Sequence, residues 1–207
     1  LIERNAFEGC SSLAQITIPS AVKTFSEKVF QNCKALYQIN FEGTPSIELI
    51  EDSAFNSCKS LKNFIIPSSV TIINNFAFFF CSNLVQIIIP SSVKSIGSYA
   101  FKRCTNLQTI SFQKPCSITE FSDGLFCDCI SFSEFMIPST ITKISNGVFK
   151  GCNIKKLYAE ENSLIKTIDK GMFEGLNSLE FIIPESVTTI KSSSFKGLHS
   201  IKHVTLP

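Results

Sequence analysis

Cysteine is the side chain in this sequence best equipped for chemistry, because a thiolate can attack a substrate, bind a metal or form a disulfide. Nine cysteines are present. Seven cysteines, which we call the row cysteines, stand three residues after a phenylalanine: Cys10, Cys33, Cys58, Cys81, Cys104, Cys129 and Cys152. Leucine takes the same position at Leu176 and Leu198. We therefore expect the row cysteines to pack as small apolar side chains in one internal row.

Two cysteines, Cys116 and Cys127, fall outside this row. With Asp128 and Cys129 they raise two alternatives, a metal site or a disulfide between Cys116 and Cys127. Their spacing matches no common zinc pattern. We therefore expect one exposed thiol and one loop thiol, both free.

The two histidines, His199 and His203, are four residues apart, a spacing that binds metals when it lies on a helix. Residues 201–204 read as a strand instead, which would turn His203 to solvent. The chain also has no G-x-S-x-G, H-E-x-x-H or glycine-rich phosphate motif, and its aspartates are scattered. Because an enzyme needs a preorganised constellation, we predict no catalytic residue, no metal, no cofactor and no enzymatic activity.

The elements that must position these residues are repeats. The phenylalanine before each cysteine or leucine of the row recurs every 22 to 25 residues, and a period of this length is typical of a solenoid. We predict a single array of about nine repeats of about 23 residues over 1–207, and we expect a fragment, because the polar caps that solenoids need are missing. The anchor phenylalanines are Phe7, Phe30, Phe55, Phe78, Phe101, Phe126, Phe149, Phe173 and Phe195.

Each repeat divides into three parts. An alternating apolar stretch of the form L-x-x-I-x-I predicts a half-buried strand, and the proline after it has no amide hydrogen to give to a ladder. Two apolar residues three apart indicate a short second strand, and the Ala-Phe-x-x-Cys segment suits one helical turn. Stacking then predicts parallel strands side by side, with loop insertions at 41–45 and 112–115, where the interval between anchors is longest.

The complete repeat pattern resembles the leucine-rich repeat of BspA-type, treponemal-type surface proteins. The pattern is L-x-x-I-x-I-P-x-x-V-x-x-I-G-x-x-A-F-x-x-C. Residues 84–104 match it almost residue for residue, and the likeness extends over the chain. It implies a right-handed α/β-type coil with a parallel β-sheet on the concave face and short strands or helical turns elsewhere. It also implies a cell-surface or secreted protein of a microbe or parasite that engages host matrix proteins, cell-surface proteins or glycans.

The composition argues against nucleic acids and membranes as partners. The formal net charge is +2, with lysine and arginine scattered among the acidic residues, so the chain lacks the electrostatic signature of a nucleic-acid or anionic-membrane binder. Residues 63–93 carry no charge, but Pro67 and Pro90 interrupt them, so we expect no membrane insertion of this segment.

Four residues form the first candidate binding surface. In the strand pattern Gln86 and Ile88 face outward, and Asn63 and Ile65 hold the same positions one repeat earlier. Because curved solenoids bind partners on the sheet face, the two isoleucines are candidate apolar anchors on a polar, amide-rich surface. The alternative is that β-branched residues merely suit a strand.

Phe79 and Phe80 form the second candidate surface, because the two positions after an anchor are mostly small or polar in the other repeats. They predict an exposed aromatic patch of the kind that marks contacts. The alternatives are burial beneath a neighbouring loop or a contact between copies.

Two functions follow. The first is a non-enzymatic adhesion module that binds a partner through its sheet face. The second is a structural spacer or self-associating array, a homo-dimer through Phe79 and Phe80. The oligomeric state of a variant lacking both rings would distinguish them.

Overall fold

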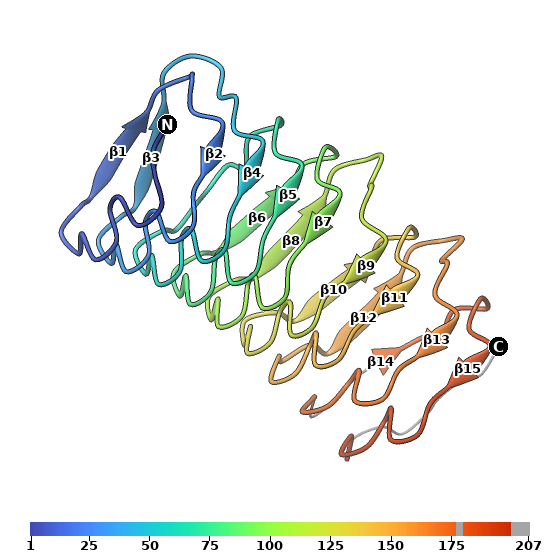
Figure 1. Ribbon diagram of the computed structural model, residues 1–207. Coiled ribbons are helices and arrows are strands. Elements are labelled where there is room, and N and C mark those ends of the chain that lie inside the picture. The colour runs from blue at the N-terminus through green and yellow to red at the C-terminus, as the bar shows by residue number, and fades with distance from the viewer. Residues whose placement is uncertain (177–179, 200–207) are drawn as a thin grey trace.

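Residues 1–176 and 180–199, as described by a computed structural model, form a solenoid of stacked, similar turns (Figure 1). A typical turn has a long strand, a short strand and a segment of tight turns that leads into the next long strand. Residues 63–66 stand at a long-strand position but form only an isolated bridge, from Asn63 to Gln86. Every strand pair is parallel, as expected where equivalent segments of successive repeats meet. The predicted leucine-rich-repeat type of solenoid is confirmed.

The strands form two layers (Figure 1). The long strands are β1 (Gln15–Ile18), β3 (Gln38–Phe41), β6 (Gln86–Ile89), β8 (Thr109–Phe112), β10 (Glu134–Ile137), β12 (Lys156–Ala159) and β14 (Glu180–Phe181). The short strands are β2 (Thr24–Phe25), β4 (Leu49–Ile50), β5 (Ile72–Ile73), β7 (Ser95–Ile96), β9 (Glu120–Phe121), β11 (Lys143–Ile144), β13 (Thr167–Ile168) and β15 (Thr189–Ile190).

Alternation fixes which side of a long strand faces the core. In β6, Ile87 and Ile89 are buried, whereas Gln86 and Ile88 are exposed. The carbonyl of Pro90 then accepts the amide of Val93 at 3.1 Å, which closes a tight turn towards the short strand.

The anchor phenylalanines form the centre of one continuous core. The rings of Phe55, Phe78 and Phe101 are fully buried and stack at centroid distances of 5.2 and 5.3 Å. Because each ring contacts only the repeats beside it, the core extends by one layer per repeat.

The turn segment is not helical, and no helix forms in 1–176 or 180–199. Around Phe78, the amide of Phe79 bonds back to Phe76 at 3.0 Å, while the amides of Phe76, Phe78 and Phe80 cross to carbonyls of the next repeat. This alternation requires a left-handed residue two positions before and two after the anchor, with φ of 55° at Phe76 and 57° at Phe80. A helix cannot form because every second amide is committed to a neighbouring repeat.

The long-strand sheet is interrupted at the two predicted insertions. No ladder joins β3 to residues 63–66 or β8 to β10, although the short strands β2, β4, β5 and β7 pair without a break across the first insertion. The extra residues at 41–45 and 112–115 therefore separate neighbouring repeats on the long-strand face.

Backbone amides of one turn segment donate to carbonyls of the next, and we call this series of hydrogen bonds the crossing-amide ladder. Within the described residues, the ladder stops before the end of the array. It links every repeat from Phe7 to Phe149, and its last bonds run from the Phe126 amide to the Val148 carbonyl at 3.0 Å and from the Asp128 amide to the Lys150 carbonyl at 2.7 Å. In the described part of the chain, no such bond joins the turn segments around Phe149 and Phe173 or those around Phe173 and Phe195.

Candidate functional site

The four residues of the first candidate surface lie together on one face of the solenoid. Asn63, Ile65, Gln86 and Ile88 are all exposed on the long-strand face, and Asn63 pairs with Gln86 in a parallel bridge. Ile65 keeps 84% of its surface and Ile88 51%, so both isoleucines present apolar area to solvent.

The break in the sheet hollows this surface. Because β3 does not pair with residues 63–66, two hollows of about 390 and 370 Å³ flank Ile65. Pro45, from the first insertion, lines both of them, and Tyr37 adds a ring that is 51% exposed. We call this surface the Ile65 notch and define it as Tyr37, Pro45, Asn63, Ile65 and Ile88.

The second break in the long-strand sheet, between β8 and β10, is bridged by polar side chains. Lys114, from the second insertion, pairs with Glu160 at 3.0 Å, and the same carboxylate accepts the amide of Ser139 at 3.0 Å. Burial would raise the pKa of Glu160, but the bonds from Ser139 and Lys114 outweigh it and lower that pKa. A polar clasp therefore spans the second break, whereas the Ile65 notch is mostly apolar and holds no charged side chain.

The predicted phenylalanine pair lies on the turn side of the solenoid. Phe79 and Phe80 are partly exposed and contact each other edge to face at 6.4 Å. Phe76 stacks on Tyr99 at 5.2 Å and meets Phe79 at 5.8 Å. These four residues, the turn-face aromatic cluster, join two neighbouring repeats.

Phe76 and Tyr99 were missed by the sequence analysis. They stand two residues before their anchors, where later repeats have Gly124, Gly147 and Gly171. A comparison of that position across the repeats would have found them, because the other repeats have glycine or a polar residue there.

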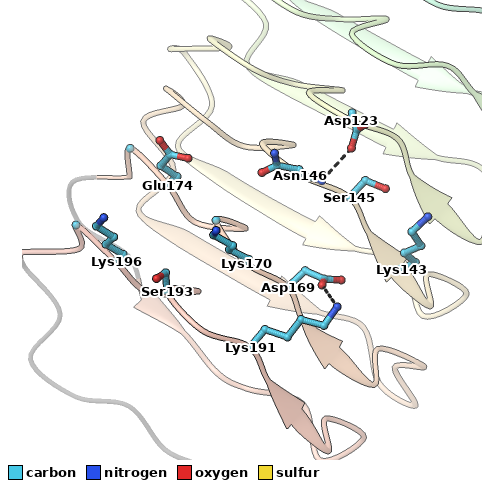
Figure 2. Close-up of a pocket in the computed structure, with 13 residues that line it drawn as sticks. Asp123, Lys143, Ser145, Asn146, Asp169, Lys170, Glu174, Lys191, Ser193 and Lys196 are labelled. Atoms are coloured by element: carbon cyan, nitrogen blue, oxygen red, sulfur yellow. Dashed lines mark hydrogen bonds and ion pairs between the residues drawn. The ribbon is translucent and has the colours of Figure 1, made fainter.

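A hollow of about 1020 Å³ lies where the crossing-amide ladder stops, and Figure 2 shows the residues that line it. Four lysines and three acidic residues line it, and Figure 2 shows Lys191 paired with Asp169 there. The Glu174 carboxylate is paired with Lys150 at 3.0 Å, which raises the pKa of that lysine. Both Asp169 and Glu174 are therefore already paired with a lysine.

The cysteine row is free and almost entirely buried, as predicted, and Cys10 alone of the row is exposed. Burial raises the pKa of Cys33 to about 11 and that of Cys152 to about 12, because the thiolate cannot be solvated there. Such thiols are poor nucleophiles at neutral pH.

The two cysteines outside the row are free, but the expected exposed thiol is not found, since Cys116 is half-buried and Cys127 is buried. Burial first, and then the Asp128 carboxylate, raise the pKa of Cys127. Among the described residues no group of three or more potential ligands is placed to hold a metal ion. His199 is exposed, and His203 lies outside the described residues.

No helix in the described ranges is long and apolar enough to cross a membrane. A family model for the BspA type leucine rich repeat region matches residues 1–131, 48–180 and 113–207, with six copies. No curated protein matches the chain.

Three solved structures are similar. The leucine rich repeat protein of T. pallidum is 28% identical with a TM-score of 0.57, over 76% of this chain and 64% of that one. A leucine-rich repeat protein from Bacteroides ovatus is 20% identical with a TM-score of 0.60, over 97% and 69%. A leucine rich cell surface protein from Faecalibacterium prausnitzii is 23% identical with a TM-score of 0.54, over 97% and 66%. The chain thus spans about two thirds of the length of each.

Proposed function

Since the chain belongs to the BspA-type leucine-rich repeat family, we propose that it is a non-enzymatic binding module of a microbial or parasite surface protein. Its partner is a host matrix or cell-surface protein, held on the long-strand face. The family, and the cell-surface description of the Faecalibacterium prausnitzii protein, support a place at the cell surface or in secretion.

The observation that carries this proposal is the exposure of Ile65. Ile65 has 84% of its surface in water, so a partner that covers this side chain lowers the free energy of the complex. The hollows on both sides give a partner's side chains somewhere to insert, and buried apolar anchors in pockets dominate most interfaces.

The long-strand face also suits a protein partner because its exposed polar groups surround the apolar centre. Asn63, Gln86 and Gln38 offer neutral amides beside Ile65, and amides bind either donors or acceptors. An apolar centre with a polar rim is the usual arrangement of a protein interface.

The experiment is binding of the chain to immobilised matrix proteins and to whole host cells. The test variant carries Ile65→Asp and Ile88→Asp. The control carries Met136→Asp, because Met136 holds the same outward position on β10 and is 52% exposed, close to the 51% of Ile88.

Saturable binding that the control retains and the double variant loses supports the proposal. Equal binding by both variants rejects the Ile65 notch as the site. If the unaltered chain binds neither matrix proteins nor cells, the spacer or self-associating function becomes the better account.

A further inference from the structure

The turn-face aromatic cluster occupies positions that disfavour aromatic residues. Phe76, Phe80 and Tyr99 have φ of 55°, 57° and 59°, in the left-handed region. Glycine takes the equivalent positions at Gly147, with φ of 65°, and Gly151, with φ of 73°. Bulky residues in this region carry backbone strain, and such strain concentrates at functional sites.

The packing of the rings determines which part of them reaches solvent. Phe76 and Tyr99 stack on each other with an interplanar angle of 16°. Tyr99 also lies against Gly124, where a Cβ atom would stand 2.2 Å from its ring. These contacts cover part of the Phe76 and Tyr99 rings, whereas Phe76 keeps 38% of its surface exposed and Phe79 and Phe80 are partly exposed.

Two lysines bring positive charge to the cluster. The Lys59 ammonium lies 4.3 Å from the centre of the Phe80 ring, and the Lys102 ammonium lies 5.3 Å from that of Tyr99. Within the described residues neither lysine forms an ion pair, whereas neighbouring Arg103 pairs with Asp128 at 3.7 Å. The ammonium groups are therefore available to an external anion.

We propose that the turn-face aromatic cluster, with Lys59 and Lys102, binds an acidic peptide segment of a protein partner. The carboxylates of that segment pair with the two ammonium groups, and an apolar side chain beside them packs on the exposed parts of the rings. This surface lies on a different side of each repeat from the Ile65 notch, so the two sites act independently.

Charge favours such a partner over a second copy of the chain. A symmetric dimer through this cluster would bring Lys59 and Lys102 of one copy towards the same residues of the other. Like charges brought together in an interface oppose association, whereas an acidic segment neutralises them.

The probe is a fluorescein-labelled copolymer of glutamate and tyrosine, measured by fluorescence anisotropy. The ring variant is Phe76→Gly with Phe80→Gly, which removes two of the four rings while giving each position the residue that suits its backbone. The charge variant is Lys59→Gln with Lys102→Gln. Lys196→Gln is the control for the charge variant, because Lys196, like Lys102, is one residue after its anchor phenylalanine.

We expect the unaltered chain and the Lys196→Gln control to bind the copolymer. The ring and charge variants should each bind about tenfold more weakly, as expected for residues at the centre of an interface. A glutamate homopolymer should also bind about tenfold more weakly, because it lacks the apolar side chain.

Three results would overturn the proposal. The first is an affinity for the copolymer that is unchanged in the ring and charge variants, or is undetectable throughout. The second is equal binding of the homopolymer, which would leave no role for the rings. The third is a dimer of the unaltered chain, measured by sedimentation, that the ring variant abolishes.

Discussion

The thiol of Cys81 donates a hydrogen bond to the backbone carbonyl of Phe55, 3.1 Å away in the preceding repeat. The same carbonyl also accepts the amide of Cys58 at 3.1 Å. The row cysteine is therefore more than a small apolar side chain, because its thiol satisfies the carbonyl of a buried anchor. The same bond recurs from Cys33 to Phe7, Cys58 to Phe30, Cys104 to Phe78, Cys129 to Phe101 and Cys152 to Phe126.

Replacing Cys81 by alanine removes this bond and leaves a small cavity between buried rings. We expect Cys81→Ala to lower the free energy of unfolding by about 1–3 kcal/mol, measured by urea denaturation. Cys10→Ala is the control, because Cys10 holds the same row position at the exposed end, and it should change stability by less than about 0.5 kcal/mol. Equal effects of the two substitutions would show that the row makes no such contribution.

The buried thiols make stability depend on alkaline pH. The pKa of Cys152 rises from 9.0 to about 12 in the folded chain, so between these values the unfolded chain has lost a proton that the folded chain keeps. Ionisation then favours unfolding, and stability present below pH 9 should fall as pH rises towards 12.

The measurement is the urea midpoint at pH 7.5, 9 and about 10.5, within the range over which unfolded cysteine ionises. Cys152→Leu, which copies Leu176 of the next repeat, should reduce the loss of stability at high pH. A loss of the same size in this variant would assign the alkaline effect to other groups.

Gly124 tests the close packing beneath Tyr99. An alanine there must adopt a φ of +58° and would place its Cβ 2.2 Å from the Tyr99 ring. Gly147→Ala, one repeat later, meets only ordinary contacts at a φ of +65°. We expect Gly147→Ala to cost about 1–2 kcal/mol from the backbone alone and Gly124→Ala about 1–3 kcal/mol more, measured by thermal denaturation. Equal costs would mean that Tyr99 does not pack there.

Because the crossing-amide ladder ends before the last repeats, we expect backbone amides to be protected unevenly from hydrogen exchange along the array. The amides of Phe55 and Phe78 donate to the next repeat at 2.8 Å, whereas that of Phe149 has no such partner among the described residues. Hydrogen–deuterium exchange followed by mass spectrometry should therefore be at least about tenfold faster in the Phe149 turn segment, since local opening costs less there. Uniform protection along the array would contradict this.

Periodicity alone predicted the repeats, the strands, the cysteine row and the outward direction of Ile65 and Ile88. It succeeded because each of these features repeats in every layer, and stacking identical layers leaves little choice of packing. The insertions at 41–45 and 112–115 were likewise visible as longer intervals between anchors.

The turn segment could not be predicted from its own residues. Its apolar spacing suits a helix, but the amides of Phe76, Phe78 and Phe80 bond to another repeat, so the neighbour decides the backbone conformation. For the same reason Phe76 and Tyr99, 23 positions apart in sequence, were not linked to Phe79. The hollows beside Ile65 arise from a break in pairing, which no single repeat encodes.

The most direct test of the proposed function is the dissociation constant of a matrix or cell-surface partner for two single variants, Ile65→Asp and Met136→Asp. Both place a carboxylate at the same outward position of a long-strand segment, and circular dichroism should confirm that both fold. We predict at least about tenfold weaker binding for Ile65→Asp and little change for Met136→Asp, as expected if Ile65 is a central anchor. Equal dissociation constants for the two variants would contradict a binding site at the Ile65 notch.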